Sequence, residues 1–193
     1  MSQDIELIVI GGSAGAIEVL GRMLAGLTAA LRPAVAVVIH LPPDGPNVLH
    51  EVFARPGSPP MKPAEDKEPI APGTVYFAPP DYHLLVESGR TFALSQDERV
   101  HFSRPALDVL FESAAEAYGD RLMGVILSGA NADGATGLKA VARAGGLTVV
   151  QALESSEMIA MPAAALKAAP DSLELNVSAL AELMQKHGEA NGR

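Results

Sequence analysis

Three polar side chains of complementary chemistry each follow a separate apolar run of the sequence. Ser13 lies in the GGSAG segment 11–15, His40 closes the run AVAVVI, and Asp133 lies in SGANADG after the run LMGVIL. A serine hydroxyl is a poor nucleophile at neutral pH unless an imidazole accepts its proton, and a carboxylate can hold that imidazole in the required tautomer. The three residue types therefore predict acyl transfer through a serine nucleophile, if the fold brings them together.

The glycines around Ser13 match the G-x-S-x-G spacing of a nucleophile elbow. A sharp turn from strand to helix needs small residues around an exposed serine. The following helix offers free backbone N–H groups and its positive dipole end to a developing oxyanion. We therefore expect Gly12 and Ala14, which flank the serine, to belong to an oxyanion or substrate-binding site.

Each of the three residues also has a simpler interpretation. A glycine-rich turn between strand and helix can bind a phosphate, a lone histidine at a strand end is more often structural, and Asp is a favoured helix N-cap. A dinucleotide site fits less well, because the glycines are out of G-x-G-x-x-G register and no acidic residue closes the second strand. The catalytic interpretation depends on finding all three at strand ends, where an open parallel sheet places its ligands.

The elements that must position these residues alternate between short aliphatic strands and helices. The strands are predicted at 7–10, 34–39, 122–127 and 147–150, and the helices at 15–25, from about 105, at 138–144 and at 177–186. In the first helix, Ile17, Leu20 and Leu24 are expected on the buried face. The alternation predicts one α/β domain over residues 1–193, a doubly wound, mostly parallel sheet with flanking helices.

Proline and glycine mark the segments outside this alternation. Residues 41–46 are rich in proline, and residues 56–73 combine prolines with an EDKE run, which predicts an irregular surface excursion. Short segments between 74 and 94, broken by Pro-Pro and Ser-Gly pairs, predict an antiparallel β-hairpin at one side of the sheet. Asp81 and His83 are expected to order the turn of this hairpin.

Composition excludes several classes of function. The 193 residues carry 14 Lys and Arg against 23 Asp and Glu, and a formal net charge of −9 argues against binding to nucleic acid. Because the chain has no cysteine and no convincing metal-ligand spacing, we expect neither a metal nor another cofactor. The absence of a signal-peptide pattern and of a membrane-length apolar run predicts a cytoplasmic protein without membrane insertion. The pattern does not indicate an oligomeric state.

Six blocks of the chain together resemble the catalytic domain of the chemotaxis receptor-glutamate methylesterase (CheB) family. The blocks are VIGGSAG, VVIH, VYFAPPDYHLLV, RPALDVLFESAA, GVILSGANADGATGLKAV and Met161-Pro162. The resemblance implies hydrolysis of glutamate γ-methyl esters on cytoplasmic helices of membrane chemoreceptors, or on a related signalling protein, with release of methanol. Some members also deamidate receptor glutamine. The resemblance puts the family's nucleophile on Ser13, its base on His40 and its acid on Asp133.

The resemblance also draws attention to positions beside the substrate groove. Arg104 falls near this groove, where it could meet an acidic receptor helix or simply be a solvated arginine at a helix start. Ala130 and Asn131 replace the Met and the second Gly of the family's G-M-G-x-D-G block, and Ala14 replaces the usual Thr after the nucleophile. These departures bear on transition-state fit and substrate preference, whereas the backbone N–H groups survive them.

Family members typically carry an N-terminal receiver domain whose phosphorylation unblocks the active site. This sequence begins at the first strand of the predicted catalytic domain, which predicts a stand-alone form controlled from elsewhere or always active. The leading hypothesis is a serine methylesterase of two-component chemotaxis signalling. The alternatives are a non-catalytic or weakly active signalling module that keeps the fold and, with less support, a nucleotide-binding domain.

Overall fold

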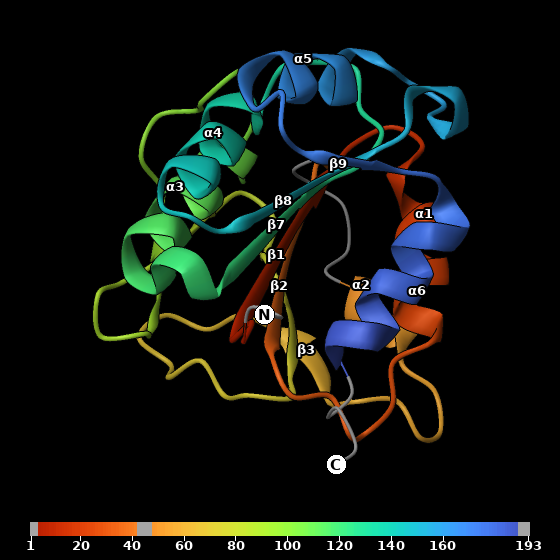
Figure 1. The fold of residues 1–193 in the computed structure, drawn as a ribbon. Helices are drawn as coiled ribbons and strands as arrows, with labels where there is room; N and C mark the ends of the chain where they lie inside the picture. Colours follow the sequence, from red (N-terminus) through yellow and green to blue (C-terminus); the bar gives the residue numbers. More distant parts are fainter. Residues whose placement is uncertain (1–3, 42–47, 189–193) are drawn as a thin grey trace.

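A computed structural model describes residues 4–41 and 48–188, and these form three layers with a sheet in the middle (Figure 1). The main sheet has seven strands in the order β3-β4-β2-β1-β7-β8-β9, and all its neighbouring strands pair in parallel. Strands β5 and β6 form a separate antiparallel pair. The predicted fold class is confirmed. The proline-rich stretch 41–46 lies outside the described residues except for Leu41.

The elements have the following bounds. The main sheet consists of β1 (Leu7–Gly12), β2 (Ala34–Ile39), β3 (Met61–Pro63), β4 (Val75–Phe77), β7 (Leu122–Ile126), β8 (Leu147–Gln151) and β9 (Leu173–Leu175). The hairpin consists of β5 (His83–Val86) and β6 (Phe92–Ser95). The helices are α1 (Ala16–Ala25), α2 (Leu49–Phe53), α3 (Leu107–Tyr118), α4 (Ala135–Arg143), α5 (Ala160–Ala168) and α6 (Val177–Gly188).

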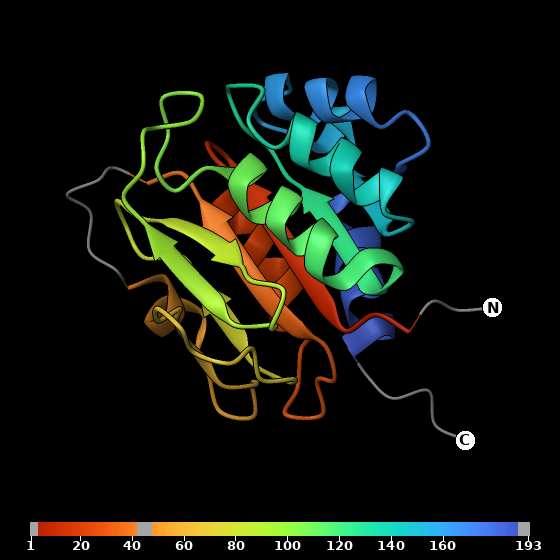
Figure 2. The ribbon, with the colours of Figure 1, turned by 90° about the vertical axis from the view of Figure 1, so that its left-hand side faces the viewer.

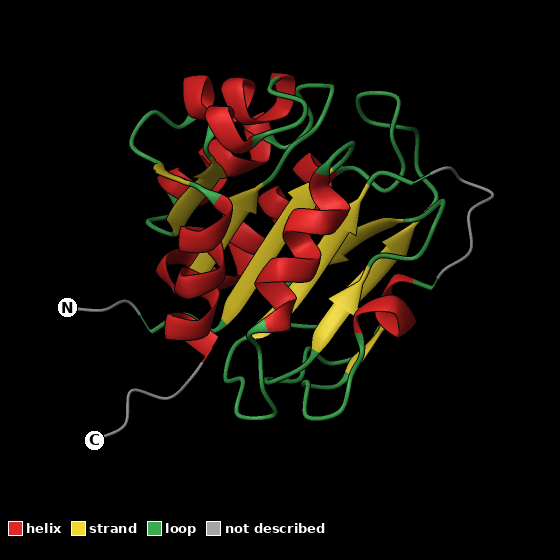
Figure 3. Cartoon of the chain, turned by 90° about the vertical axis from the view of Figure 1, so that its right-hand side faces the viewer, coloured by secondary structure: helices red, strands yellow, loops and turns green. Residues whose placement is uncertain are grey.

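Alternation along β1 divides the core into two layers. Leu7 and Val9 pack with α3, α4, α5 and the hairpin, whereas Ile8 and Ile10 pack with α1 and α6 on the opposite face. Figure 2 shows α3, α4 and the hairpin across the first face, and Figure 3 shows α1 and α6 across the second. Because both faces are covered, the central strands are continuous apolar runs.

Some local expectations were wrong. The segment 56–73, expected to be irregular, contributes the edge strand β3, and β4 joins the main sheet instead of the hairpin. Ile17 is 43% exposed, because the buried stripe of α1 runs through Ala16, Leu20 and Met23 and leaves Ile17 to one side. Helix α5 and strand β9 have no counterpart among the predicted elements, and a three-residue strand is too short to show a period.

The order of the strands determines where the functional loops meet. β1 lies between β2 and β7, so the chain leaves β1 toward one side of the sheet and later returns to the other side. Such a topological switch point opens a crevice at the carboxyl ends of the strands. The loops after β1, β2 and β7 carry Ser13, His40 and Asp133, respectively. No helix within the described residues is both long and apolar enough to span a bilayer.

Helices α3 and α4 pack against each other at a glycine. A Cβ atom on Gly137 of α4 would lie 2.5 Å from the Cβ of Phe111 and 3.1 Å from the Cα of Asp108, both on α3. Neither atom belongs to the flexible end of a side chain. The absence of a side chain at position 137 therefore sets the distance between the two helices.

We predict that Gly137→Ala lowers the free energy of unfolding by about 1–3 kcal/mol, because an added methyl group forces packed helices apart. Guanidinium denaturation of the variant and the wild type measures the difference. Gly89→Ala is the matched control, since nothing lies within 4 Å of a Cβ at that position. Equal unfolding midpoints for Gly137→Ala and the wild type would contradict the close packing.

Candidate active site

The strand register places Ser13 and His40 side by side at the carboxyl edge of the sheet. Gly12 at the end of β1 pairs with Ile39 at the end of β2, and the His40 N–H donates to the Gly12 carbonyl at 3.0 Å. The Ser13 N–H donates to the Ser128 carbonyl at 2.9 Å, which ties the serine to the loop after β7. Three strand ends therefore fix the backbone around the candidate nucleophile.

The turn that presents Ser13 depends on its glycines. Gly15 has a φ of +79°, and a Cβ there would lie 2.6 Å from the Cβ of Glu157, so only glycine fits. A Cβ on Gly12 would lie 2.5 Å from the Cβ of Ala16, so this glycine lets strand β1 approach helix α1 closely. Ser13 itself is not among the residues with positive φ. The left-handed backbone position of this elbow, which needs glycine, is thus Gly15.

The N–H group of Ala14 is available as an oxyanion donor. Ala14 is exposed, and its N–H has no hydrogen-bond partner in the part of the chain that the structure describes. The N–H of the residue after the nucleophile is a common oxyanion donor in serine hydrolases. The Gly12 carbonyl accepts the His40 N–H, and the oxyanion or substrate-binding role expected for Gly12 stays a prediction.

His40 and Asp133 form a hydrogen-bonded pair at the carboxyl edge of the sheet. The His40 Nε2 lies 2.8 Å from Oδ2 of Asp133, whose side chain is fully buried, while the imidazole is 12% exposed. An ionised carboxylate only accepts hydrogen bonds, so Nε2 carries the proton and Nδ1 is the free basic nitrogen. Within the described residues, no side-chain hydrogen bond joins Ser13 to His40, and such bonds commonly tighten only when substrate binds.

Asp133 is held by the N-terminus of α3. Its Oδ2 accepts the Leu107 N–H at 2.7 Å and its Oδ1 accepts the Asp108 N–H at 3.0 Å. Helix α3 has Ala106 at its N-cap, a residue whose side chain cannot cap, and the first N–H groups of a helix need acceptors. Asp133 therefore caps α3, a helix distant in sequence, and not the helix α4 that follows it.

Asp108 caps helix α4 in the same way. Its Oδ1 accepts the Gly137 N–H at 2.7 Å, in the first turn of α4, whose N-cap residue Gly134 offers no side chain. Asp133, in the loop just before α4, thus caps α3, and Asp108 of α3 caps α4, so each carboxylate lies in the positive field at a helix N-terminus. This exchange fixes the position of Asp133 relative to α3 and therefore the direction of the bond to His40.

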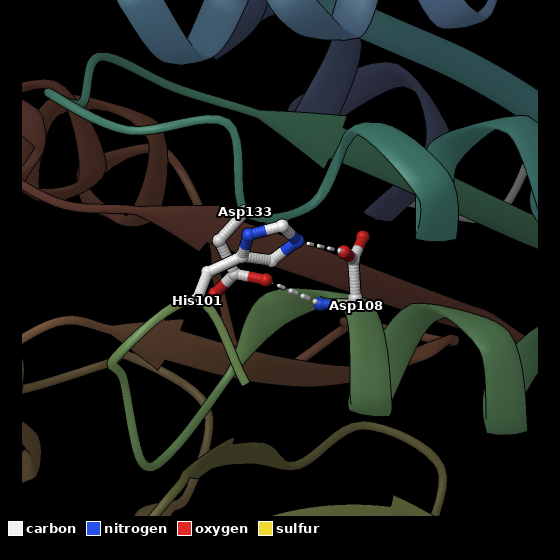
Figure 4. Close-up of side chains that lie close together, drawn as sticks. All are labelled: His101, Asp108 and Asp133. Carbon is white, nitrogen blue, oxygen red and sulfur yellow. Dashed lines mark hydrogen bonds and ion pairs between the residues drawn. The ribbon is translucent and has the colours of Figure 1, made fainter. Parts of the chain in front are cut away.

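Asp108 is also the partner of an exposed histidine. Figure 4 shows the ring of His101 directed at the carboxylate of Asp108, beside Asp133. The Nε2 atom of His101 lies 3.2 Å from Oδ2 of Asp108. Burial raises the pKa of Asp108 above its ordinary value, and the nearby charge of Asp133 raises it further, whereas the Gly137 N–H and His101 lower it. The carboxylate is therefore easier to protonate than an exposed one.

The same three side chains bring their ligand atoms within 4.8 Å of one another, a spacing that could hold a metal ion. Both oxygens of Asp133 already accept N–H groups, and Asp108 accepts Gly137. A metal ion would have to compete with these helix caps. The arrangement therefore favours a capping role for the carboxylates.

Arg104 and its partner Asp81 anchor the loop before α3. The Nε and Nη2 atoms of Arg104 donate to Oδ1 of Asp81 at 3.1 and 2.8 Å, and Nη1 donates to the carbonyls of Gln96 and Asp97. The guanidinium lines the same small cavity as His40. Its contacts lie within the chain, so the substrate-binding role expected for Arg104 stays a prediction.

His83 also holds the loop before α3 in place. Its Nδ1 accepts the Ala106 N–H at 3.2 Å, so its Nε2 carries the proton and donates to the Glu98 carbonyl at 3.0 Å. His83 and Asp81 therefore hold the loop that leads into α3, which differs from the expectation that they order the hairpin turn. With the bonds to Asp133, three successive N–H groups at the start of α3 have side-chain acceptors.

Comparisons with known proteins identify the family of this chain. The family model described as CheB methylesterase matches residues 8–184. A protein of Leptospira interrogans, named putative protein-glutamate methylesterase/protein-glutamine glutaminase, is 42% identical over 186 residues, 96% of each chain. The chain belongs to the CheB methylesterase family.

A solved structure supports the assignment. The CheB methylesterase catalytic domain of Thermotoga maritima is 28% identical, with a TM-score of 0.85 over 94% of this chain and 98% of that one. A Caulobacter vibrioides protein named protein-glutamate methylesterase/protein-glutamine glutaminase 2 is 34% identical over 85% of this chain. The present chain spans 48% of the length of that relative, about half.

The CheB-type site depends on two polar residues that the sequence patterns did not single out. Ser128 is buried; its Oγ donates to the Ala14 carbonyl at 2.7 Å and accepts the Met158 N–H at 2.9 Å. The buried amide of Gln151 accepts the Ser128 N–H at 2.9 Å. The signal that could have found them is a polar residue that ends an apolar strand, since such a residue lies at the ligand-binding edge.

The substituted block after β7 keeps a defined shape in this family member. Asn131 accepts the Asp133 N–H on its Oδ1 at 3.1 Å, a turn typical of asparagine, and this contact orders the backbone that carries the acid. Ala130 is exposed, and its N–H has no partner among the residues described. The role of Ala130 as an oxyanion or substrate-binding position stays a prediction.

We predict that Asp108→Ala lowers the free energy of unfolding by about 1–3 kcal/mol, because it leaves the buried Gly137 N–H without an acceptor. Asp108→Asn retains an acceptor oxygen and should cost less. The pKa of Asp108 is higher in the folded state than in the unfolded state. The wild type therefore loses stability as the pH rises from the unfolded-state pKa through the folded-state pKa. The stability of Asp108→Asn relative to the wild type should therefore improve as the pH rises from 4 through that pKa.

Denaturant titrations of the three proteins at several pH values measure both effects. Glu154→Gln, which changes an exposed acid elsewhere, is the control for a general effect of charge. A difference between wild type and Asp108→Asn that is the same at every pH would contradict the raised pKa. Full stability of Asp108→Ala would contradict the capping role.

Proposed function

We propose that this CheB-family chain is a serine methylesterase in which Ser13 is the nucleophile, His40 the general base and Asp133 the orienting acid. The observation that carries the proposal is the bond from His40 to the buried Asp133, at the strand end beside Ser13. The names of the relatives support glutamate γ-methyl esters as the substrate and glutamine side chains as a second one.

The reaction would proceed in two halves. The Ser13 oxygen attacks the ester carbonyl carbon while Nδ1 of His40 takes the hydroxyl proton, and the Ala14 N–H stabilises the oxyanion. His40 then returns the proton to the departing methoxide, which leaves as methanol. Water attacks the acyl-serine in the same way and releases the glutamate side chain. With glutamine, ammonia would leave in place of methanol.

The partners follow from the same proposal. The substrate would be a methylated cytoplasmic helix of a membrane chemoreceptor or of a related signalling protein, and the reaction would take place in the cytoplasm. The net charge of −9 argues against nucleic acid as a partner. The mechanism needs no cofactor, because serine, histidine and aspartate supply the nucleophile, the proton transfer and the charge stabilisation.

We predict that Ser13→Ala reduces methanol release from methylated receptor peptides by at least about a thousandfold, because the residual rate comes from binding and oxyanion stabilisation alone. Ser88→Ala, which removes an exposed hydroxyl from the turn between β5 and β6, is the control and should retain full activity. A wild type that releases no methanol and does not react with a serine-directed phosphonate would contradict the proposal and favour a non-catalytic module.

Asp133→Asn tests the orientation of the imidazole. An amide has one acceptor oxygen, so its NH₂ group would face either the Asp108 N–H or the side occupied by Leu107 and His40. We predict a fall in kcat of about ten-thousandfold, as expected when the imidazole loses the required tautomer. Steady-state kinetics measure the loss, and circular dichroism checks folding. A folded variant with wild-type kcat would exclude Asp133 from the relay.

A further inference from the structure

A two-residue turn projects from the loop before α3. Val100 and Ser103 form an isolated antiparallel bridge in which each N–H donates to the other's carbonyl, at 3.2 and 2.9 Å. The two residues between them, His101 and Phe102, both have positive φ, +49° and +62°. Positive φ at both central positions is the geometry of a type I′ hairpin turn.

The residues at the tip are unusual for this turn. Asn and Gly are the residues that such turns favour, and a bulky aromatic residue with positive φ is an outlier. Phe102 gains no burial in exchange, because it is 96% exposed. Local backbone preference and the hydrophobic effect both disfavour Phe at this position, and conflicts of this kind concentrate at functional sites.

The turn is anchored on both sides. His101 contacts the buried carboxylate of Asp108, the residue that exchanges helix caps with Asp133. Arg104 binds Asp81, and His83 binds the Glu98 carbonyl at the start of the loop. Phe102 is therefore presented from a loop that is tied to the same scaffold as the catalytic acid.

The turn also forms one wall of the cavity next to the catalytic histidine. This cavity of about 90 Å³ is lined by His40 and Leu41 on one side and by the loop on the other, through Arg99, Phe102, Ser103, Arg104 and Pro105. Among the residues that the structure describes, no acidic side chain lines it. Arg104 is bound by Asp81, but Arg99 is half exposed and lies 3.9 Å from the same carboxylate.

These contacts define what a substrate would meet. Because Phe102 and Arg99 line the cavity beside His40, a polypeptide whose ester reaches His40 comes close to the phenyl ring and the guanidinium. The ring offers an apolar surface of large area, and the guanidinium attracts a carboxylate. An acidic, amphipathic polypeptide segment has both groups.

We propose that the turn 100–103 is a docking element for the polypeptide substrate, in which Phe102 packs against an apolar side chain and Arg99 pairs with a carboxylate flanking the methylated glutamate. This inference rests on the proposed esterase function and assigns substrate recognition to residues outside the catalytic relay. Because the element touches the polypeptide and not the ester, it determines binding of large substrates and leaves the chemical step unchanged.

The test compares a large and a small substrate. Wild type and Phe102→Asn are assayed with a methylated, glutamate-rich helical peptide and with p-nitrophenyl acetate. We expect kcat/KM for the peptide to fall about tenfold through KM, the size of one lost aromatic contact, with the acetate rate unchanged. Asn adopts positive φ readily, so the variant should fold at least as well as the wild type.

Two further variants test whether the effect is specific to the turn and whether charge contributes to it. Leu173→Asn changes another exposed apolar residue, at the amino end of β9 and therefore at the opposite edge of the sheet, and should leave both substrates unaffected. Arg99→Gln should raise KM for the acidic peptide at low ionic strength, and this difference should shrink in high salt, since exposed charges are screened.

The outcomes separate the two proposals. If the wild type hydrolyses neither the peptide nor the acetate, the esterase function fails. If it hydrolyses both, but Phe102→Asn leaves KM for the peptide unchanged, the docking element fails. An equal loss on both substrates would also overturn the docking role, because it would place Phe102 in support of the catalytic residues. A shift from dimer to monomer in Phe102→Asn with unchanged KM would assign the turn to self-association.

Discussion

The carboxylate of Asp133 is buried at the point where three loops meet. It accepts the N–H groups of Leu107 and Asp108 and the ring N–H of His40. A buried carboxylate without such donors costs several kcal/mol, so the fold must deliver all of them to one place. The start of α3 and the end of β2 are thereby fixed relative to the loop after β7. The candidate active site and the packing of the helices are consequences of the same requirement.

The exchange of carboxylates between α3 and α4 joins stability to function. Asp108 satisfies the first turn of α4, and Gly137 allows the two helices to come close enough for this contact. The orientation of Asp133, the proposed orienting acid, is therefore set by helix N–H groups. Asp108 also pairs with His101, so the loop before α3 is tied to the helix pair that holds Asp133.

The loops at the carboxyl edge of the sheet differ in the residues they carry and in what holds them in place. The loops after β1 and β2 carry Ser13 and His40, the proposed nucleophile and base, and are fixed by strand register. The loop before α3 supplies exposed groups and is fixed by side chains of Asp81 and His83. Exposed residues of the loop before α3 can therefore change without disturbing the strands that carry Ser13 and His40.

The sequence by itself determined the parallel sheet, the CheB-family resemblance and the residues at three strand ends, because buried strands and glycine-rich turns leave local patterns. It did not indicate β3 or β9, which are too short for a period, nor the supporting roles of Ser128 and Asp108. Only the tertiary structure decided which helix Asp133 caps and which nitrogen of His40 is free. Those contacts join residues 26 and 93 positions apart, and hydrogen bonds over such separations have no signature in local spacing.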